Sequence, residues 1–490
     1  MRSLSLLEHS GAPPDRPAVL VGGRYAVGYG ELDALTVEVG RELGTGAKAV
    51  VLCRMSRDIP SIVGYLAALR AGHCVLPVEF ATPAVLDDLV GTYRPEIVLD
   101  AGTDGWTPSG YRGRPLSVGA GSLNMAFRAE GTAGTVHPET GLLLRTSGSL
   151  GRSKAVRLTY ANVAANALSI ATALALGATD RAPITLPLEY SFGLSVLHSH
   201  LAAGASVVLG PHSPTSAKFR RWSAATGCTA LYAVPTTYRL LLAGHWRAVD
   251  HGHLRALYQA GGALPTEDIR YFAEQMAAVG GTFTVMYGQT EATARMTVLD
   301  PARTLDRCGS VGSAIPGGRL WIADEDEPGR RLPDGEVGEV YYSGPNVMQG
   351  YATGRADLAA GDECGGVLAT GDLGRVRDGL LYLAGRRDRV VKLLGRRINL
   401  AEVEAAFAGV ATEVAVVATP PGGRPARMVV CLSGAVPAPE SLARRRGEIA
   451  VELGLPVPMI DMVPMPRLPR TVSGKVDYPA LLRSVRMDGS

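Results

Sequence analysis

Short apolar runs alternate with amphipathic segments along much of this chain, and this alternation is the strongest constraint on its fold. Residues 49–54 (AVVLCR) have the composition of a buried strand, and residues 59–72 (IPSIVGYLAALRAG) have the pattern of a helix. The order then repeats, with a helix at 84–94 between strands at 74–80 and 96–100. Strands that alternate with helices are typical of parallel sheets covered by helices. We therefore predict an α/β fold.

The same pattern returns between residues 205 and 290. A helix is predicted at 266–280, and strands are predicted at 205–210, 229–234, 254–262 and 282–288. Several strands run directly into small or polar loops, with the sequences AGGALP, YGQTEAT and RTSGSLG. Because ligands gather where loops leave the carboxyl ends of parallel strands, we expect these loops to form one composite pocket.

The chain has 490 residues, which is too many for one ordinary domain. Residues 310–385 are rich in glycine, proline and Asp-Gly turns, which predicts hairpins and a small β-barrel. After Asp388 the pattern changes to a compact α/β unit of about 100 residues, a normal size for a small domain. We predict one domain at 1–387 and a second at 388–490.

Composition excludes several classes of protein. The net charge is +3 and the basic residues are scattered, so nucleic acid is not expected as a partner. Six dispersed cysteines without a CxxC pair argue against a metal cluster or a disulfide framework, and they fit a reducing compartment. No signal peptide and no run of about 18 apolar residues is present, so we expect a cytoplasmic protein without a membrane span.

The segment LLLRTSGSLGRSKAVRLTY (142–160) joins an apolar run to a small-residue loop with one lysine. Backbone N–H groups, hydroxyls and a cation in such a loop favour binding of a phosphate. It differs from a P-loop because Gly148 and Gly151 are too close together and no serine or threonine follows Lys154. On its own the segment fits a solvated turn equally well.

Four further motifs follow in order: MYGQTEAT (286–293), ATGDLG (369–374), GRRDRVVKLLGRRINLAEVE (385–404) and PRTVSGKVDY (469–478). With all five motifs, the chain resembles the AMP-forming adenylating enzymes over nearly its whole length. That family includes acyl- and aryl-CoA synthetases, peptide-synthetase adenylation domains and luciferase. The resemblance implies a large N-terminal domain of parallel α/β sheets with a small β-barrel, followed by a small mobile C-terminal α/β lid domain.

The resemblance also implies a reaction in two halves that uses ATP and Mg²⁺. A carboxylate attacks the α-phosphate to give acyl-AMP and pyrophosphate, and a thiol or amine then displaces AMP. Two unit charges at about 4 Å repel by roughly 4 kcal/mol at an effective dielectric constant near 20. Cations and oriented dipoles must therefore offset the approach of the carboxylate to the phosphates.

The motif residues take their roles from this resemblance. In the YGQTE motif, which includes Gly288, Tyr287 would stack on adenine. Thr290 would bond the α-phosphate and Glu291 would ligate Mg²⁺. Lys475 would bridge the substrate carboxylate and the α-phosphate.

Other residues would complete the nucleotide site. Asp372 would accept both ribose hydroxyls, and Arg386 would reach the ribose or the phosphates. The adenine would lie flat against Gly261, Gly262 and Ala263. The β- and γ-phosphates would be held by the loop residues Thr146, Ser147, Gly148, Ser149, Gly151 and Lys154.

The position of Lys475 in the C-terminal domain implies that this domain closes for adenylation, and the resemblance implies that it then rotates for the second half-reaction. Asp388 occupies the hinge position, and Lys392 and Gly395 would line the acceptor tunnel. The chain departs from the family at two positions of the phosphate loop. Leu150 stands where threonine is usual and Ala155 where glycine is usual, so ATP use is expected to be slower or differently arranged.

The substrate pocket of the family lies beside PLEYSFGLSVLHSHLAAG (187–204). Peptide-synthetase domains place an aspartate there to pair with the ammonium of an amino acid, and this chain has Ser191. Because a buried ammonium without a counter-charge is costly, we expect an aryl, cyclic or acyl acid with an uncharged body. The predicted pocket residues are Tyr190, Ser191, Phe192, Gly193, Ala233, Val234 and Ala260.

The acceptor is left open by the sequence. Coenzyme A or a carrier-protein phosphopantetheine leads, and an amine, giving an amide in secondary metabolism, is the alternative. A kinase or hydrolase would release ADP or phosphate instead of AMP and pyrophosphate, and a non-catalytic relative is expected to lack Lys475 or Glu291. His198 and His200 stand two residues apart, do not share a helix face, and are expected to be core or pocket histidines.

Overall fold

The computed structural model describes most of the chain, in the ranges 3–22, 25–44, 46–79, 81–102, 106–129, 134–146, 154–210, 212–394, 396–407, 410–419, 427–471 and 475–487. It divides into two compact units. The first unit contains Met1–Leu320 and Tyr342–Leu368, and the second contains Trp321–Tyr341 and Ala369–Ser490. Each unit is described by itself.

An eight-stranded sheet dominates the first unit, in the order β19-β9-β8-β4-β3-β5-β7-β6. Its central strands β8, β4, β3 and β5 run parallel, and β9, β19, β7 and β6 add antiparallel edges. Their bounds are β3 (Val50–Arg54), β4 (Cys74–Val78), β5 (Ile97–Asp100), β6 (Tyr111–Val118), β7 (Gly121–Arg128), β8 (Thr140–Thr146), β9 (Lys154–Thr159) and β19 (Gly350–Ala352). Strand β4 is buried at every position, as expected for a central parallel strand.

Two smaller sheets complete the first unit, in the orders β10-β11-β1-β2 and β12-β13-β14-β15-β16. The first consists of β1 (Pro17–Val21), β2 (Tyr25–Gly28), β10 (Arg181–Pro183) and β11 (Ser206–Leu209). The second consists of β12 (Ala230–Ala233), β13 (Ala256–Gln259), β14 (Thr282–Tyr287), β15 (Thr297–Val298) and β16 (Ser313–Ala314). Strands β12, β13 and β14 are parallel, so the loops that follow them leave the same edge of the sheet.

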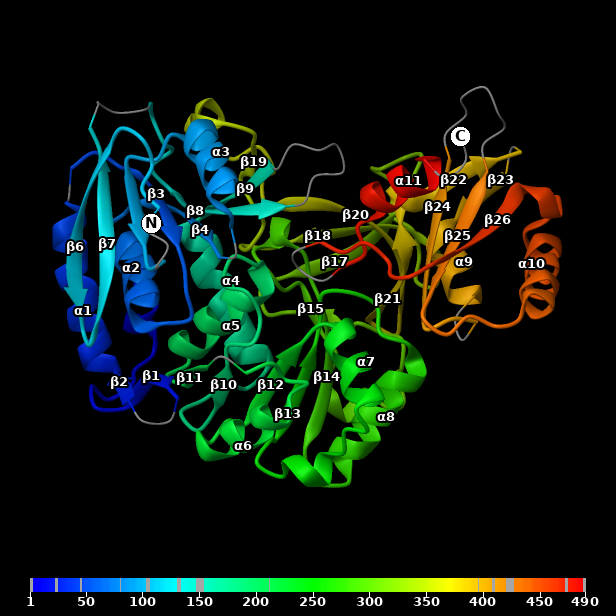
Figure 1. The fold of residues 1–490 in the computed structure, drawn as a ribbon, viewed down its shortest axis with the longest axis horizontal. Helices are drawn as coiled ribbons and strands as arrows, with labels where there is room; N and C mark the ends of the chain where they lie inside the picture. Colours follow the sequence, from blue (N-terminus) through cyan, green and yellow to red (C-terminus); the bar gives the residue numbers. More distant parts are fainter. Residues whose placement is uncertain are drawn as a thin grey trace. The chain divides into compact units, whose positions relative to one another are not determined.

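Helices cover these sheets, and α7 and α8 lie beside the strands β12 to β14 (Figure 1). The helices of the first unit are α1 (Tyr29–Leu43), α2 (Ile59–Arg70), α3 (Pro83–Tyr93), α4 (Tyr160–Ala173), α5 (Ser191–Ala202), α6 (Ala217–Ala225), α7 (Pro235–Ala243) and α8 (Thr266–Ala277). Helix α4 begins with a capping box, in which Thr159 and Asn162 satisfy each other's backbone N–H groups. Helix α5 is buried along its whole length.

The second unit contains most of a four-stranded sheet in the order β17-β18-β20-β21, with β17 and β21 as its edges. This sheet lies in the region for which the sequence predicts a small β-barrel. The second unit also contains a hairpin and the three-stranded sheet β24-β25-β26. The strands are β17 (Arg319–Ala323), β18 (Gly338–Ser343), β20 (Val367–Arg377), β21 (Leu380–Arg386), β22 (Val390–Leu393), β23 (Arg396–Asn399), β24 (Glu413–Ala418), β25 (Met428–Ser433) and β26 (Ile460–Met465). The helices α9 (Leu400–Ala406) and α11 (Tyr478–Met487) pack on β24, and α10 (Pro439–Leu453) packs on β26.

The predicted α/β fold is confirmed, and the strands and helices predicted from hydrophobic patterning are present. The predicted boundary at Asp388 separates a large domain from a mobile C-terminal domain, and it remains a prediction. None of the helices in the described ranges combines the length and apolar character needed to cross a bilayer.

The eight-stranded sheet should be highly sensitive to loss of side-chain volume. Leu76 in β4 is fully buried in a cluster that includes Leu52 and Leu143. We expect Leu76→Ala to lower the free energy of unfolding by about 2–5 kcal/mol, measured by urea denaturation. Leu240→Ala is the matched control, because Leu240 is 56% exposed in the same unit and its truncation should change stability by less than about 0.5 kcal/mol. Equal losses in the two variants would contradict the assignment of this core.

Candidate functional site

The predicted phosphate loop joins two paired strands. Thr146 ends β8 and Lys154 begins β9, and these residues face each other in the antiparallel register. The Thr146 hydroxyl donates to the Lys154 carbonyl oxygen at 3.3 Å. Ser147, Gly148, Ser149, Leu150 and Gly151 lie outside the described residues. Ala155 is fully buried in β9, so this departure from the family's glycine places a methyl group in the core.

Tyr351 connects the predicted phosphate lysine with the predicted magnesium ligand. The Lys154 ammonium lies 3.5 Å from the centre of the Tyr351 ring, a cation–π contact. The Tyr351 hydroxyl donates to Glu291 Oε1 at 2.8 Å. Sequence reasoning missed Tyr351, because its place in the site depends on the pairing of β19 with β9 across almost two hundred residues.

The YGQTE segment places Thr290 next to the predicted acid pocket. Strand β14 ends at Tyr287, and the 3-10 helix η3 (Thr290–Ala292) follows. The hydroxyl oxygens of Thr290 and Ser191 are hydrogen-bonded at 3.1 Å, and Ser191 begins helix α5. Residues predicted separately for phosphate contact and for the acid are therefore neighbours in the first unit.

Glycines allow the close approach of the predicted adenine-binding segments. Gly261 follows β13 with φ at +89°, and a Cβ there would lie 2.7 Å from the Tyr190 hydroxyl. Gly262 accepts a hydrogen bond from the Gln259 side chain at 2.8 Å. Gly262 and Ala263 are exposed, so they present a surface without bulky side chains on which a flat ring can lie.

The predicted acid pocket is aromatic and largely buried. The Phe192 ring lies 6.2 Å from Tyr190 and 6.3 Å from Tyr232, edge-on to both. Ala233, the last residue of β12, and Ala260, which follows β13, are buried. Val234 is half-buried.

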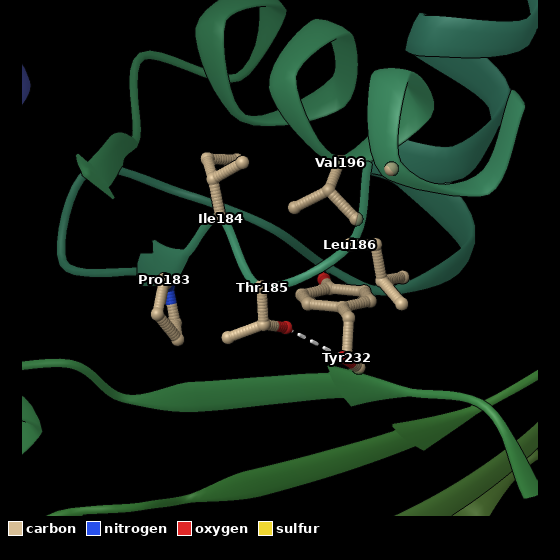
Figure 2. Close-up of a pocket in the computed structure, with 7 residues that line it drawn as sticks. Pro183, Ile184, Thr185, Leu186, Val196 and Tyr232 are labelled. Atoms are coloured by element: carbon tan, nitrogen blue, oxygen red, sulfur yellow. Dashed lines mark hydrogen bonds between the residues drawn. The ribbon is translucent and has the colours of Figure 1, made fainter. Parts of the chain in front are cut away.

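A narrow gap with no room for a water molecule lies next to this cluster, between the start of α5 and the end of β12. Figure 2 shows the Tyr232 ring beside Leu186, with Ile184 and Val196 across the gap. The Thr185 hydroxyl donates to the Tyr232 carbonyl oxygen at 3.1 Å, which fixes one wall. Of the predicted substrate residues, the lining includes Gly193.

Arg295 is a buried cation in this region that sequence reasoning missed. Its side chain is 1% exposed, and its guanidinium carbon lies 4.0 Å from the centre of the Phe192 ring. Burial lowers the pKa of Arg295 from its ordinary value to about 10, so the group stays charged at neutral pH. The available signal was its position, four residues after Glu291 in an otherwise apolar and small-residue stretch.

In the second unit, Asp372 and Arg386 form the predicted ribose-side pair. They are cross-strand neighbours on β20 and β21, and Arg386 Nη1 lies 3.3 Å from Asp372 Oδ1. Asp372 is buried, whereas half of the Arg386 side chain is exposed. Arg386 Nε also donates to Asp388 Oδ1 at 3.0 Å.

Two ion pairs flank the predicted hinge residue Asp388, which lies in the 3-10 helix η6 (Arg387–Arg389). Arg387 Nη1 donates to Glu339 on β18 at 2.9 Å. Arg389 Nη2 donates to Glu404 on α9 at 2.7 Å, and the Arg389 guanidinium carbon lies 3.7 Å from the centre of the Tyr478 ring. Asp388 therefore separates two anchored arginines, while its own side chain is largely exposed.

The remaining predicted residues are placed less fully. Lys475 is exposed before α11, and its carbonyl oxygen accepts from the Thr471 N–H at 2.8 Å. Lys392 lies in β22, and Gly395 lies outside the described residues. His198 and His200 are buried in α5, as expected for core histidines, and burial lowers the pKa values of both. His198 Nε2 lies 2.8 Å from the Tyr65 hydroxyl.

The first unit fits a magnesium–nucleotide ligand at Glu291. One carboxylate oxygen is held by Tyr351, and the other makes no hydrogen bond with any residue in the described ranges. Mg²⁺ typically takes one or two carboxylates together with phosphate oxygens. Glu291 would hold such an ion, and Lys154 and Thr290 would contact the phosphates. No group of three or more His, Cys, Asp or Glu side chains positioned for a metal occurs in the described part of the chain.

Several known proteins are similar to this chain in sequence or in fold. Residues 117–352 match the family described as AMP-binding enzyme. Sulfoacetate–CoA ligase from Cupriavidus necator is 36% identical over 268 residues, covering 54% of this chain and 51% of that protein. Feruloyl-CoA synthase from Amycolatopsis sp. is 32% identical over 300 residues, covering 60% of this chain and 58% of that protein. The matches therefore span little more than half the length of these relatives.

The crystal structure of ATP-bound MatB from Rhodopseudomonas palustris has the same fold, with a TM-score of 0.79, 22% identity and coverage of 99% of this chain and 98% of that one. Residues 117–352 therefore match the AMP-binding enzyme family, and the predicted resemblance of the chain to the AMP-forming adenylating enzymes is confirmed.

The YGQTE turn should not tolerate a side chain at its glycine. A Cβ at Gly288 would overlap the carbonyl oxygen of Ala294, which is backbone. We expect Gly288→Ala to lower the free energy of unfolding by about 1–3 kcal/mol in urea titrations. Gly177→Ala serves as the control, because a Cβ there meets no atom within 4 Å. Unchanged stability in Gly288→Ala would mean that the turn adopts another conformation.

Proposed function

We propose that this protein is an ATP-dependent acid ligase that activates a carboxylic acid as acyl-AMP, releases pyrophosphate, and transfers the acyl group to a thiol. The observation that carries the proposal is the cluster in the first unit. There Lys154, Tyr351 and Glu291 form one chain of contacts, and Thr290 bonds directly to Ser191 at the acid pocket. Such a cluster offers cations and hydroxyls to a polyphosphate on one side and an apolar slot to an acid on the other.

The first half-reaction requires two anions to approach each other. Lys154 and Thr290 would hold the phosphates, and Mg²⁺ held by Glu291 would neutralise part of their charge. Lys475 would place a further cation between the acid and the α-phosphate. Because Lys475 belongs to the second unit, together with the ribose-side residues Asp372 and Arg386, domain closure is part of the proposal.

The acid is not an ordinary α-amino acid. Ser191 stands where an aspartate would pair with an ammonium, and its hydroxyl is bonded to Thr290. The charged Arg295 side chain, stacked on Phe192, adds a repulsive term for a cationic substrate. Two relatives are named for sulfoacetate and feruloyl substrates, neither of which is an α-amino acid.

The second half-reaction uses coenzyme A or a carrier-protein phosphopantetheine as the acceptor. Asp388 would act as the hinge, and Lys392 and Gly395 would line the thiol's path. The ion pairs of Arg387 and Arg389 hold the chain on either side of Asp388, so rotation would be concentrated at this residue.

A pyrophosphate-release screen over free acids tests the proposal. We expect aryl, cyclic or acyl acids to release pyrophosphate and AMP, and zwitterionic amino acids to release little. Lys475→Ala should slow pyrophosphate–ATP exchange by about 100-fold or more, since it removes a cation from the reacting centre. Lys218→Ala, at an exposed position on α6, is the control and should retain full exchange. Undiminished exchange in Lys475→Ala, or a preference for alanine over benzoate-like acids, would contradict the proposal.

The hinge can be tested separately from the chemistry. Proline fixes φ near −65°, so Asp388→Pro should restrict rotation and slow thioester formation by about tenfold or more, with a smaller effect on acyl-AMP formation. Asp388→Ala keeps the backbone free and should affect both steps less. Single-turnover assays of the two half-reactions provide the measurement, with coenzyme A and simple amines compared as acceptors. Equal loss of both half-reactions in Asp388→Pro would argue against a hinge at this position.

A further inference from the structure

Arg295 carries a buried positive charge that the proposed reaction does not use. Its Nη1 donates to the Ser195 hydroxyl at 3.2 Å, and its Nε donates to the Met286 sulfur at 3.3 Å. Its Nη2 is buried and has no hydrogen-bond partner among the described residues. Its backbone carbonyl accepts from the side chains of Asn166 and Asn346, each at 3.0 Å, which fixes its position. A buried donor without a partner is costly and calls for a ligand group to satisfy it.

The charge of Arg295 also lacks a carboxylate. Two other deeply buried arginines of the first unit each have one: Arg157 pairs with Glu363 at 2.7 Å and Arg355 pairs with Glu96 at 2.6 Å. Within the described ranges, no acidic side chain forms an ion pair with Arg295. The groups that act on its charge are the side chains of Tyr232 and Tyr190, and neither is a carboxylate. Since an unpaired buried charge costs several kcal/mol, Arg295 is expected to meet an anion in the working protein.

The position of Arg295 places that anion at the far end of the acid. Ser191, at the first turn of α5, contacts Thr290, where the reacting carboxylate is expected. Ser195, one turn further along α5, contacts Arg295. Four residues of helix correspond to about 6 Å, which gives the approximate spacing between the two ends of the acid. Phe192, between the two serines, stacks against the Arg295 guanidinium.

We propose that the preferred acid carries a second anionic group, a carboxylate or a sulfonate, and that this group pairs with Arg295 Nη2. The inference rests on the proposed function and specifies its substrate class. This substrate class replaces the acid with an uncharged body that was expected from the sequence. That expectation rested on the presence of serine instead of aspartate at position 191, and it did not include the buried cation Arg295. Arg295 is then the specificity-determining residue of the acid pocket.

Matched pairs of acids test the inference in the wild-type protein. In each pair the second group is ionised in one member and a neutral amide of the same shape in the other: adipate with its monoamide, glutarate with its monoamide, and terephthalate with 4-carbamoylbenzoate. Pyrophosphate release is measured as kcat/KM for each acid. We expect the dianionic member of at least one pair to be preferred by about tenfold or more, because the amide leaves the Arg295 charge unpaired.

Substitutions assign the preference to Arg295. Arg295→Met should abolish the preference, chiefly by raising KM for the dianionic acid, and Arg295→Lys should retain part of it. Arg319→Met, at an exposed position on β17, is the control and should keep the wild-type ratio. Thermal unfolding verifies that each variant is folded. The comparison of matched acids in the wild-type protein tests the inference even if a variant fails to fold.

The possible failures are distinguishable. If wild-type protein releases pyrophosphate equally well with both members of every pair, or better with the amides, the inference is wrong while the proposed function stands; Nη2 is then satisfied by water. A dianion preference that persists in folded Arg295→Met would also overturn it. If no acid of any kind releases pyrophosphate, the proposed function itself fails, and the inference fails with it.

Discussion

The pairing of strand β19 with strand β9 determines the shape of the candidate site, and the buried Arg157 side chain stabilises that pairing. From β9, Arg157 donates to the carbonyl oxygens of Tyr351, Ala360 and Gly361 and pairs with Glu363. Gly350 leaves room for this arrangement, because a Cβ there would overlap the Glu363 carboxylate. The consequence is that Tyr351 lies between Lys154 and Glu291, where one phenol contacts both a cation and a carboxylate. A single satisfied guanidinium thus supports the part of the site that would face a polyphosphate.

Helix α5 organises the other half of the site. It is buried along its length, and its serines Ser191 and Ser195 face two different partners, Thr290 and Arg295. The contrast between the two buried arginines is informative. Arg157 has carbonyl and carboxylate partners for its donors, as a structural group requires, whereas Arg295 keeps an unpartnered donor within the described part of the chain. Arg157 is therefore part of the scaffold, whereas the unpartnered donor of Arg295 supports its proposed role in binding the acid.

In the second unit, the proposed hinge residue Asp388 lies between two arginines that are held by ion pairs. Arg387 is bound to Glu339 and Arg389 to Glu404, so the residues on either side of Asp388 are held by different elements. Asp388 itself is exposed and contacts the neighbouring Arg386. Rotation at one exposed residue disturbs few buried groups, which keeps the energetic cost of a domain motion low.

Hydrophobic patterning in the sequence was sufficient to predict strands at 49–54, 74–80 and 282–288, which correspond to β3, β4 and β14, because burial and period are local properties. The ordered motifs likewise predicted the family, which is confirmed, and nucleotide-site roles for Thr290, Glu291 and Asp372, which remain predictions. The sequence did not predict Tyr351 or Arg295, and the structure alone placed them. The position of Tyr351 depends on the register of two strands that lie far apart in the sequence. The importance of Arg295 depends on the absence of an acidic side chain paired with its charge among the described residues. Both are properties of packing in three dimensions, which no local pattern of residues encodes.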